Sequence, residues 1–296
     1  MGRPAAEGLP AERSAAERSA AERLAAEPPI PNGLDASLVL LRHGESTAIA
    51  EGRFQGASDV TLSPAGRRQA QLAAMRLAHP HASPALPVPL GRPLEIVHSS
   101  LARATETARF VAEAAAAPDA FDHRLTVRPD AAFVEVGQGE WEGQLATDIA
   151  VQWADVLAAW RRRPAETHAP GGESLAQVQA RVRPALGRML ECMAEGRPPG
   201  TLDRPQVLGN ADPIEDRPWS ILVAHDGVFK VVLLTLFGMG LDRFWTFPFA
   251  LCGISVVEFR AGRATLRAHN LTEHLAPLLE ERAQAVSDAR ERSGAL

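Results

Sequence analysis

The chain has 296 residues, a mass of 31.7 kDa and a net charge of −5 at pH 7. Its hydrophobic fraction of 46% and charged fraction of 23% exclude wholesale disorder, and no stretch approaches the ~18 consecutive apolar residues of a membrane span. The acidic balance argues against nucleic-acid binding. Two cysteines, Cys192 and Cys252, cannot build a disulfide framework, which favours a cytoplasmic location. The first residues lack an apolar signal region, so we expect no secretory signal.

Residues 1–34 differ in composition from the rest of the chain. The unit SAAER occurs twice, over residues 14–18 and 19–23, and three prolines follow near the end of the segment. A five-residue repeat does not give a helix one apolar stripe. We therefore predict a solvated low-complexity tail and linker over residues 1–34 and one folded domain over residues 35–296.

From residue 36 onward, short apolar runs alternate with helical patterns. Ser63 and Pro64 are typical of the start of a helix, as the capping residue and the first helical residue. The predicted strands cover residues 37–41, 94–98 and 220–224, followed by a hairpin over 254–259 and 264–269, and the predicted helices cover residues 63–78, 101–117, 145–160, 174–195 and 228–237. This alternation predicts an α/β fold, a three-layer sandwich with a mostly parallel central sheet and helices on both faces.

Polar residues follow three of these strands. Ligands of open α/β sheets bind beyond the carboxyl ends of the strands, so these residues are candidates for a functional site. They are Arg42 and His43 after the first strand, Arg103 a few residues after the second, and His225 after the most apolar strand. Glu135 is a candidate carboxylate for the same site.

This set of side chains suits phosphoryl transfer. Arginines offer planar donors matched to phosphate oxygens, a neutral histidine offers a nucleophilic ring nitrogen, and a carboxylic acid can protonate a leaving oxygen. The residues thus predict transfer through a phosphohistidine with no metal and no cofactor. A zinc site is not expected, because only His79 and His81 share a close spacing, in a Pro-rich loop.

Five ordered blocks resemble the histidine phosphatase superfamily, which includes the cofactor-dependent phosphoglycerate mutases. They are Leu-Arg-His-Gly-Glu at residues 41–45, Arg-Phe-Gln-Gly at 53–56, Ser-Ser with Arg103 and Thr107, Glu135 with Gly-Glu-Trp-Glu-Gly at 139–143, and Gly-Gly-Glu-Ser at 171–174 before His225. The resemblance covers about residues 36–277. It identifies residues 35–296 as one histidine-phosphatase-like catalytic domain.

The resemblance implies a role for each matched residue. His43 would be the phosphorylated nucleophile, and Glu135 would be the general acid and then the general base. Arg42, Arg103 and His225 would hold the phosphoryl oxygens. Ser46, Gln55 and Asp226 are further candidates for phosphate binding, although Ser46 and Gln55 equally suit loop capping, and Glu140 and Glu142 are alternatives to Glu135 as the acid. The sequence departs from the common family pattern at Ile49, often asparagine, and at Asp226-Gly227.

The short acid segment resembles the phosphatase branch, so the first hypothesis is a cytoplasmic, bacterial phosphomonoesterase acting on a small phosphorylated metabolite. The alternatives are a mutase of phosphoglycerate and a non-catalytic phosphate-binding scaffold. A mutase is disfavoured because the chain has no tyrosine and only one basic cluster, residues 161–163, near the acid segment. We expect the loops over residues 79–93, 145–170 and 197–218 to contact the leaving group. The substrate and the oligomeric state do not follow from the sequence.

Overall fold

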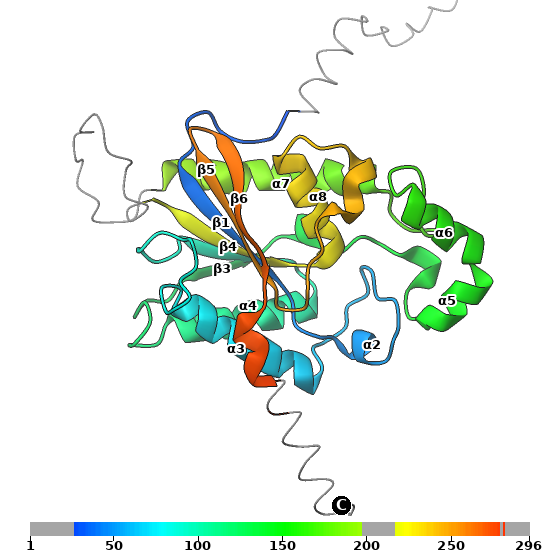
Figure 1. The fold of residues 1–296 in the computed structure, drawn as a ribbon, viewed down its shortest axis with the longest axis horizontal. Helices are drawn as coiled ribbons and strands as arrows, with labels where there is room; N and C mark the ends of the chain where they lie inside the picture. Colours follow the sequence, from blue (N-terminus) through cyan, green and yellow to red (C-terminus); the bar gives the residue numbers. More distant parts are fainter. Residues whose placement is uncertain (1–26, 197–216, 279–280, 282–296) are drawn as a thin grey trace, which may run out of the picture.

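The protein is a six-stranded sheet covered by helices on both faces. The structure, a computed structural model, describes residues 27–196, 217–278 and 281. The strand order is β3-β2-β4-β1-β5-β6 (Figure 1). The strands are β1 (Ala36–Arg42), β2 (Glu95–His98), β3 (Thr126–Pro129), β4 (Trp219–Ala224), β5 (Ile254–Arg260) and β6 (Arg263–Leu271). The first four strands are parallel to one another, and only the β1–β5 and β5–β6 pairs are antiparallel. The mostly parallel sheet is therefore confirmed.

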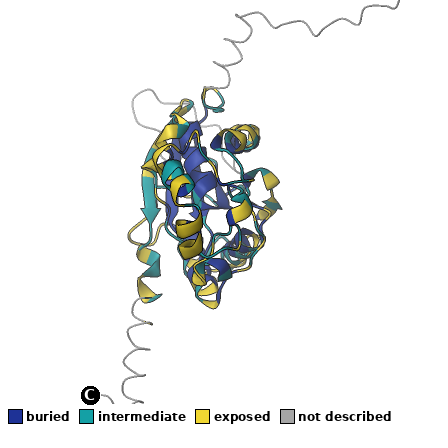
Figure 2. Ribbon diagram, turned by 90° about the vertical axis from the view of Figure 1, so that its right-hand side faces the viewer, coloured by how far each residue is buried: buried dark blue, intermediate teal, exposed yellow. Residues whose placement is uncertain are grey.

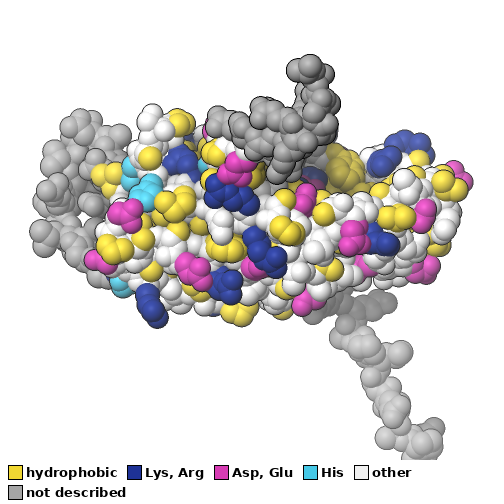
Figure 3. All heavy atoms as spheres, turned by 90° about the horizontal axis from the view of Figure 1, so that it is seen from below, with side chains coloured by type: hydrophobic (Ala, Val, Ile, Leu, Met, Phe, Trp, Pro, Cys, Tyr) yellow, Lys and Arg dark blue, Asp and Glu magenta, His cyan; other side chains and the backbone are white. Residues whose placement is uncertain are grey.

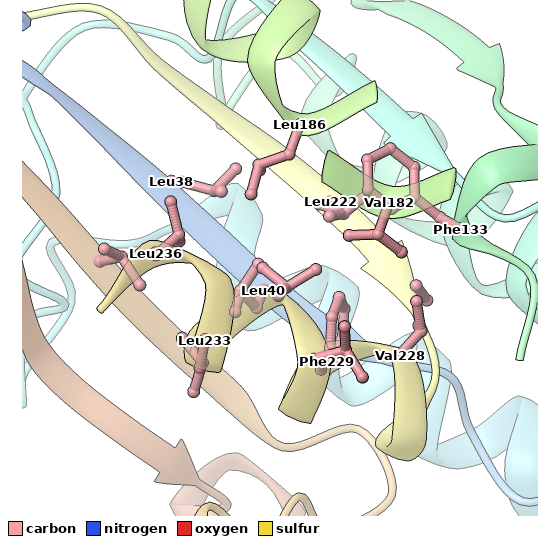
Figure 4. Close-up of a cluster of buried hydrophobic side chains, with 14 of the residues drawn as sticks. Leu38, Leu40, Phe133, Val182, Leu186, Leu222, Val228, Phe229, Leu233 and Leu236 are labelled. Carbon is pink, nitrogen blue, oxygen red and sulfur yellow. The ribbon is translucent and has the colours of Figure 1, made fainter. Parts of the chain in front are cut away.

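Alternating side chains of the central strands divide the core between the two faces. In β1, Val39 and Leu41 belong to the cluster under α3 (Pro64–Ala78) and α4 (Ala102–Ala115). Leu38 and Leu40 point to the other face, where α7 (Leu175–Glu195) and α8 (Asp226–Leu236) cover them (Figure 4). Because both faces are covered, the central strands β1, β4 and β5 are buried almost throughout, whereas the helices carry many of the exposed residues (Figure 2).

The remaining helices are short. They are α2 (Thr47–Ala50), α5 (Ala146–Gln152), α6 (Ala154–Arg162) and the 3-10 turns η1 (Ala131–Phe133), η2 (Gly139–Trp141), η4 (Leu241–Thr246) and η5 (Glu273–Leu275). The prediction of one helix over residues 145–160 is wrong, because the helix is interrupted at Trp153, between the end of α5 and the start of α6. The break lets Ile149 of α5 and Leu157 of α6 pack with Trp141 in a small separate core. Strand β3 was not predicted, and it is a four-residue strand with mostly exposed residues at the edge of the sheet.

The N-terminal boundary lies earlier than the sequence indicated. Leu34 is 3% exposed and belongs to the larger core cluster, and Ile30 packs against the same cluster. The carbonyl of Leu34 also accepts a hydrogen bond from the backbone of Gly262 at 3.0 Å. The prediction of a solvated linker is therefore wrong for these residues, because apolar side chains among the prolines complete the core. Residues 1–26 of the predicted tail lie outside the described residues.

The topology also decides which loops can reach the site. The strands β1, β2 and β4 are parallel, so their carboxyl ends lie at the same end of the sheet. Residues 79–93 precede β2, so they lie at the opposite end, and their predicted contact with the leaving group is wrong. Most of the 197–218 loop lies outside the described residues. Of the two predicted loops that the structure describes, residues 145–170, which carry α5 and α6 at the side of the sandwich (Figure 1), remain a candidate, and the contact of residues 197–218 stays a prediction.

On the face of the molecule that Figure 3 shows, basic and acidic side chains are interspersed. Within the described part of the chain, no helix is both long enough and apolar enough to cross a membrane.

Candidate active site

His43 lies directly after β1 and is fully buried. Its Nδ1 lies 2.6 Å from the carbonyl oxygen of Gly44, and its Nε2 lies 3.3 Å from Nε of Arg103. A carbonyl can only accept a hydrogen bond and a guanidinium can only donate one. The proton of the neutral ring is therefore on Nδ1, and Nε2 presents a lone pair. Burial, and then the charges of Arg103 and Arg42, hold the pKa of His43 well below its usual value, so the ring is neutral at pH 7.

The sequence around His43 fits a close contact with the start of α3. A Cβ on Gly44 would lie 2.3 Å from the carbonyl oxygen of Gly66, and a Cβ on Gly66 would lie 1.9 Å from that of Glu45. Both positions therefore require glycine. Ser63 caps α3 and donates its hydroxyl to Glu45 at 2.6 Å. The glycine and the glutamate after His43 thus fix the strand exit against the helix.

Arg103 lies in the first turn of α4 and is fully buried. Besides pointing Nε at His43, it donates to the carbonyl oxygens of Ser58 and Gly56, both at 2.8 Å. Burial lowers the pKa of Arg103 to about 10, although Glu135 and other carboxylates act in the opposite direction. The guanidinium therefore remains charged at pH 7, and its orientation beside His43 is fixed by hydrogen bonds to the backbone.

His225 follows β4, and its ring centroid lies 4.9 Å from that of His43. Its Nε2 is 2.7 Å from Oγ of Ser99, the residue after β2. Its Nδ1 is buried with no hydrogen-bond partner among the described residues, and the same holds for Nε of Arg42, whose Nη1 donates to the carbonyl of Phe249. Buried polar atoms are rarely left unpaired. Two nitrogen atoms near His43 are therefore available to the oxygens of an anion.

Burial lowers the pKa of His225 well below its usual value, and the neighbouring His43 and the arginines act in the same direction. His225 is therefore neutral at pH 7. The tautomer with the proton on Nδ1 offers that atom as a donor, with Nε2 accepting from Ser99.

Glu135 follows η1, and its carboxylate caps the start of α8. Oε1 accepts hydrogen bonds from the backbones of Val136 at 2.9 Å and Val228 at 3.0 Å, and Oε2 accepts one from Gly227 at 3.1 Å. A Cβ on Gly227 would lie 2.6 Å from Oε1, so any larger residue there would displace the carboxylate of Glu135. These contacts place Glu135 beside the residues that follow His225. Among the carboxylates, Glu135 also raises the pKa of Arg103 the most.

The structure thus brings together five predicted residues: Arg42, His43, Arg103, Glu135 and His225. Ser46 and Gln55 bond to each other at 2.6 Å, and the hydroxyl of Ser46 caps α2 by accepting from the backbone of Ile49, which fits the loop-capping alternative. Asp226 pairs with Lys230 at 2.6 Å. A contact of Ser46, Gln55 or Asp226 with phosphate stays a prediction.

The two alternative acids have other surroundings. Glu142 accepts from the backbones of Ala57 and Gln138, at 2.9 and 2.8 Å, and from the hydroxyl of Ser58. It therefore joins the loop behind Arg103 to the segment after Glu135. Glu140 is exposed. These contacts favour Glu135 as the acid.

Sequence reasoning missed the partners that hold the site from behind. Ser99 belongs to the Ser-Ser block of the family resemblance, but the sequence predicted no role for it. Arg181 of α7 was not among the predicted site residues. Arg181 forms a salt bridge with Glu173, and the Nε–Oε1 distance is 2.7 Å. The only sequence signal is the position of Glu173 in the Gly-Gly-Glu-Ser block. Among the residues that the structure describes, no group of three or more histidines, cysteines or carboxylates is arranged to hold a metal ion.

Comparisons with known proteins agree with this geometry. The family described as "Histidine phosphatase superfamily (branch 1)" matches residues 38–197 and 210–272. The chain is 27% identical to phosphoserine phosphatase 1 of Hydrogenobacter thermophilus, over 84% of this chain and 99% of that protein. It is 34% identical to glucosyl-3-phosphoglycerate phosphatase of Mycobacterium tuberculosis, over 67% of this chain and 74% of that protein.

Among solved structures, the mycobacterial glucosyl-3-phosphoglycerate phosphatase in complex with VO3 superposes with a TM-score of 0.63 at 28% identity, covering 80% of this chain and 99% of that chain. Both the sequence match and the fold extend over the domain that carries the five clustered residues. The chain therefore belongs to the histidine phosphatase superfamily, branch 1.

Proposed function

We propose that this phosphatase hydrolyses a small phosphorylated metabolite through a phosphohistidine formed on Nε2 of His43. The observation that carries the proposal is the neutral, buried His43 ring, whose unprotonated Nε2 faces Nε of Arg103 at 3.3 Å. Two buried nitrogen atoms near this ring, Nε of Arg42 and Nδ1 of His225, have no hydrogen-bond partner among the described residues. Such atoms can bind the phosphoryl oxygens as the charge on the group is redistributed in the transition state.

In the first step, Nε2 of His43 attacks phosphorus and the bond from phosphorus to the ester oxygen breaks. The leaving oxygen takes a proton from Glu135, so the alcohol departs neutral. In the second step, Glu135 takes a proton from water, the oxygen of that water attacks phosphorus, and the bond to Nε2 breaks. Inorganic phosphate is released, and His43 and protonated Glu135 are restored.

The hydrogen bonds of Glu135 indicate which oxygen carries the proton. Oε1 accepts two backbone hydrogen bonds, from Val136 and Val228, and this occupies both of its lone pairs. Oε2 accepts one, from Gly227, and keeps one lone pair. We therefore assign the transferred proton to Oε2.

The compartment and the substrate class are also part of the proposal. Both cysteines are free, Cys192 exposed and Cys252 buried, which suits a reducing cytoplasm. The relatives named above are called phosphatases of phosphoserine and of glucosyl-3-phosphoglycerate. Both names describe small phosphate monoesters, so we propose a substrate of this class, and the residues 145–170 as the region that contacts its leaving group.

The test is phosphoenzyme formation with a His43→Ala variant. The wild type should form a phosphoenzyme that is labile in acid and stable in base, and His43→Ala should form none and lose several orders of magnitude in rate. The matched control is His81→Ala, because His81 is an exposed histidine whose Nε2 lies 3.2 Å from the carbonyl oxygen of Pro89, in the loop that precedes β2 at the opposite end of the sheet. Activity of the wild-type level in His43→Ala would overturn the proposal. Isomerisation of 3-phosphoglycerate that depends on 2,3-bisphosphoglycerate and exceeds phosphate release, measured by phosphorus NMR, would indicate a mutase.

A further inference from the structure

The backbone segment that carries Glu135 is held by one guanidinium group. Arg181 points from α7 at this segment, and its Nη1 donates to the carbonyl oxygens of Ala132 at 2.7 Å and Val134 at 2.9 Å. Its Nη2 donates to the carbonyl oxygen of Glu135 itself at 3.2 Å. Three main-chain oxygens on four consecutive residues are therefore bound to the same planar group.

The other donors of Arg181 bind Glu173 in a bidentate pair. Nε donates to Oε1 and Nη2 donates to Oε2, both at 2.7 Å. The two side chains are only 21% and 23% exposed, so solvent screens the pair less than a surface ion pair. With this pair, Arg181 makes five hydrogen bonds, as many as its five N–H groups can donate.

Glu173 in turn holds the far end of the acid segment. Its backbone N–H donates to the carbonyl of Gly137 at 2.8 Å, and its Oε2 accepts from the backbone of Gly137 at 3.3 Å. The segment from residue 132 to residue 137 is thus fixed from behind by α7 and by the residue two positions before it. The start of α7 is itself fixed by a capping box formed by Ser174 and Gln177.

Glu135 is consequently held at both ends. Its main-chain oxygen is bound by Arg181, and its carboxylate is bound by the first turn of α8. If the main-chain contact is lost, the carboxylate can move relative to His43 and to the leaving oxygen. A displacement of about 1 Å at a catalytic group can cost ~10²-fold in rate.

We propose that Arg181 is a positioning residue for the acid–base step, and that it acts by fixing where Oε2 of Glu135 lies. The inference rests on the proposed role of Glu135. Lysine should replace Arg181 poorly, because an ammonium group cannot reproduce the planar fork that binds a carboxylate and three carbonyls together.

The test compares substrates with poor and good leaving groups. The probes are phosphoserine, whose alkoxide leaves only when protonated, and p-nitrophenyl phosphate, whose leaving group needs little protonation. The quantity measured is kcat/KM, which reports the phosphorylation step. For Arg181→Met we expect kcat/KM to fall ~10- to 100-fold for phosphoserine and to stay within about threefold for p-nitrophenyl phosphate.

The matched control is Arg188→Met. Arg188 lies on the same helix, but it is exposed and its nearest carboxylate oxygen, on Asp130, is 3.7 Å away. This variant should leave both kcat/KM values unchanged. Should Arg181→Met fail to fold, Arg181→Lys keeps the charge without the fork and should show the same leaving-group dependence with a smaller loss.

Combination with Glu135→Gln separates positioning from a merely structural role. In the Glu135→Gln background, Arg181→Met should cause no further loss on phosphoserine, because no proton remains to be positioned. Additive losses, or equal losses on both substrates, would overturn the inference. If Glu135→Gln itself shows no leaving-group dependence, the proposed acid is wrong. If Glu135→Gln shows it and Arg181→Met does not, only the inference about Arg181 is wrong.

Discussion

The hydroxyl of Ser99 provides a sharp test of how the second histidine is held. Ser99 is fully buried, and its Oγ lies 2.7 Å from Nε2 of His225. The same oxygen accepts a weaker hydrogen bond from the backbone of Leu101 at 3.3 Å. Replacing Ser99 by alanine removes the group that fixes the ring orientation and leaves Nε2 of His225 buried without a partner.

The size of the effect follows from the contacts. Ser99 acts on catalysis only through His225, so Ser99→Ala can cost at most the hydrogen bond between His225 and the phosphoryl group. A hydrogen bond to a charged group contributes ~1.5–3 kcal/mol, and each 1.36 kcal/mol corresponds to a factor of ten. We therefore expect kcat/KM to fall at least ~10-fold and by no more than ~150-fold. The free energy of unfolding should fall by ~1–3 kcal/mol, because a buried nitrogen atom loses its partner.

The assay is steady-state hydrolysis of p-nitrophenyl phosphate, with urea unfolding of the same preparations. Ser220→Ala is the matched control, because Ser220 is also a fully buried serine, one strand away on β4, but its hydroxyl has no hydrogen-bond partner among the described residues. This control should keep its activity. A value of kcat/KM within twofold of the wild type for Ser99→Ala would refute the reasoning, and an equal loss in Ser220→Ala would indicate a general packing effect.

Three other outcomes are expected. The pKa of His43 is lowered, so its ring should stay neutral as the pH falls below 6.5 and become protonated only at the lowered pKa; a ring half protonated at pH 6.5 in a nitrogen NMR titration would contradict this. Leu34→Ala should lower the free energy of unfolding by ~2–5 kcal/mol without changing kcat. Leu90→Ala, at a 55% exposed position, should change the free energy of unfolding by less than ~0.5 kcal/mol. EDTA should leave the rate unchanged, since Arg42, Arg103 and His225 supply the binding groups; loss of activity restored by one divalent ion would show a misassigned site.

The sequence predicted well the features that depend on neighbours in the chain. Ser63 followed by Pro64 marks the start of α3, and the structure confirms that start to the residue. The rule that ligands bind beyond the carboxyl ends of strands selected Arg42, His43 and His225 without knowledge of the strand order. The parallel pairing of β1 with β4 then brings the two histidines together.

Features that depend on a distant partner were not predictable in the same way. Leu34 stands among prolines and polar residues, and only the position of the hairpin from β5 to β6 makes it part of the core. The break at Trp153 serves a small core shared with Trp141, and no proline or glycine marks it. Arg181 is 46 residues from Glu135, the residue it holds, and an arginine on a helix is usually an exposed one.

The energetics of the site also depend on residues that are distant in the chain. The pocket around His43 works against stability, because burial lowers the pKa of Arg103 to about 10, which corresponds to a cost of about 3 kcal/mol for the charged form. The unfolded chain keeps this proton to a higher pH than the folded chain, so the cost is fully present at neutral pH and fades only as the pH rises above about 10. Two backbone carbonyls, those of Gly56 and Ser58, offset part of it. The charge of Arg103 beside His43 therefore lowers the stability of the fold, whereas Arg181 and Glu173 form an ion pair that binds the backbone of Glu135 and Gly137.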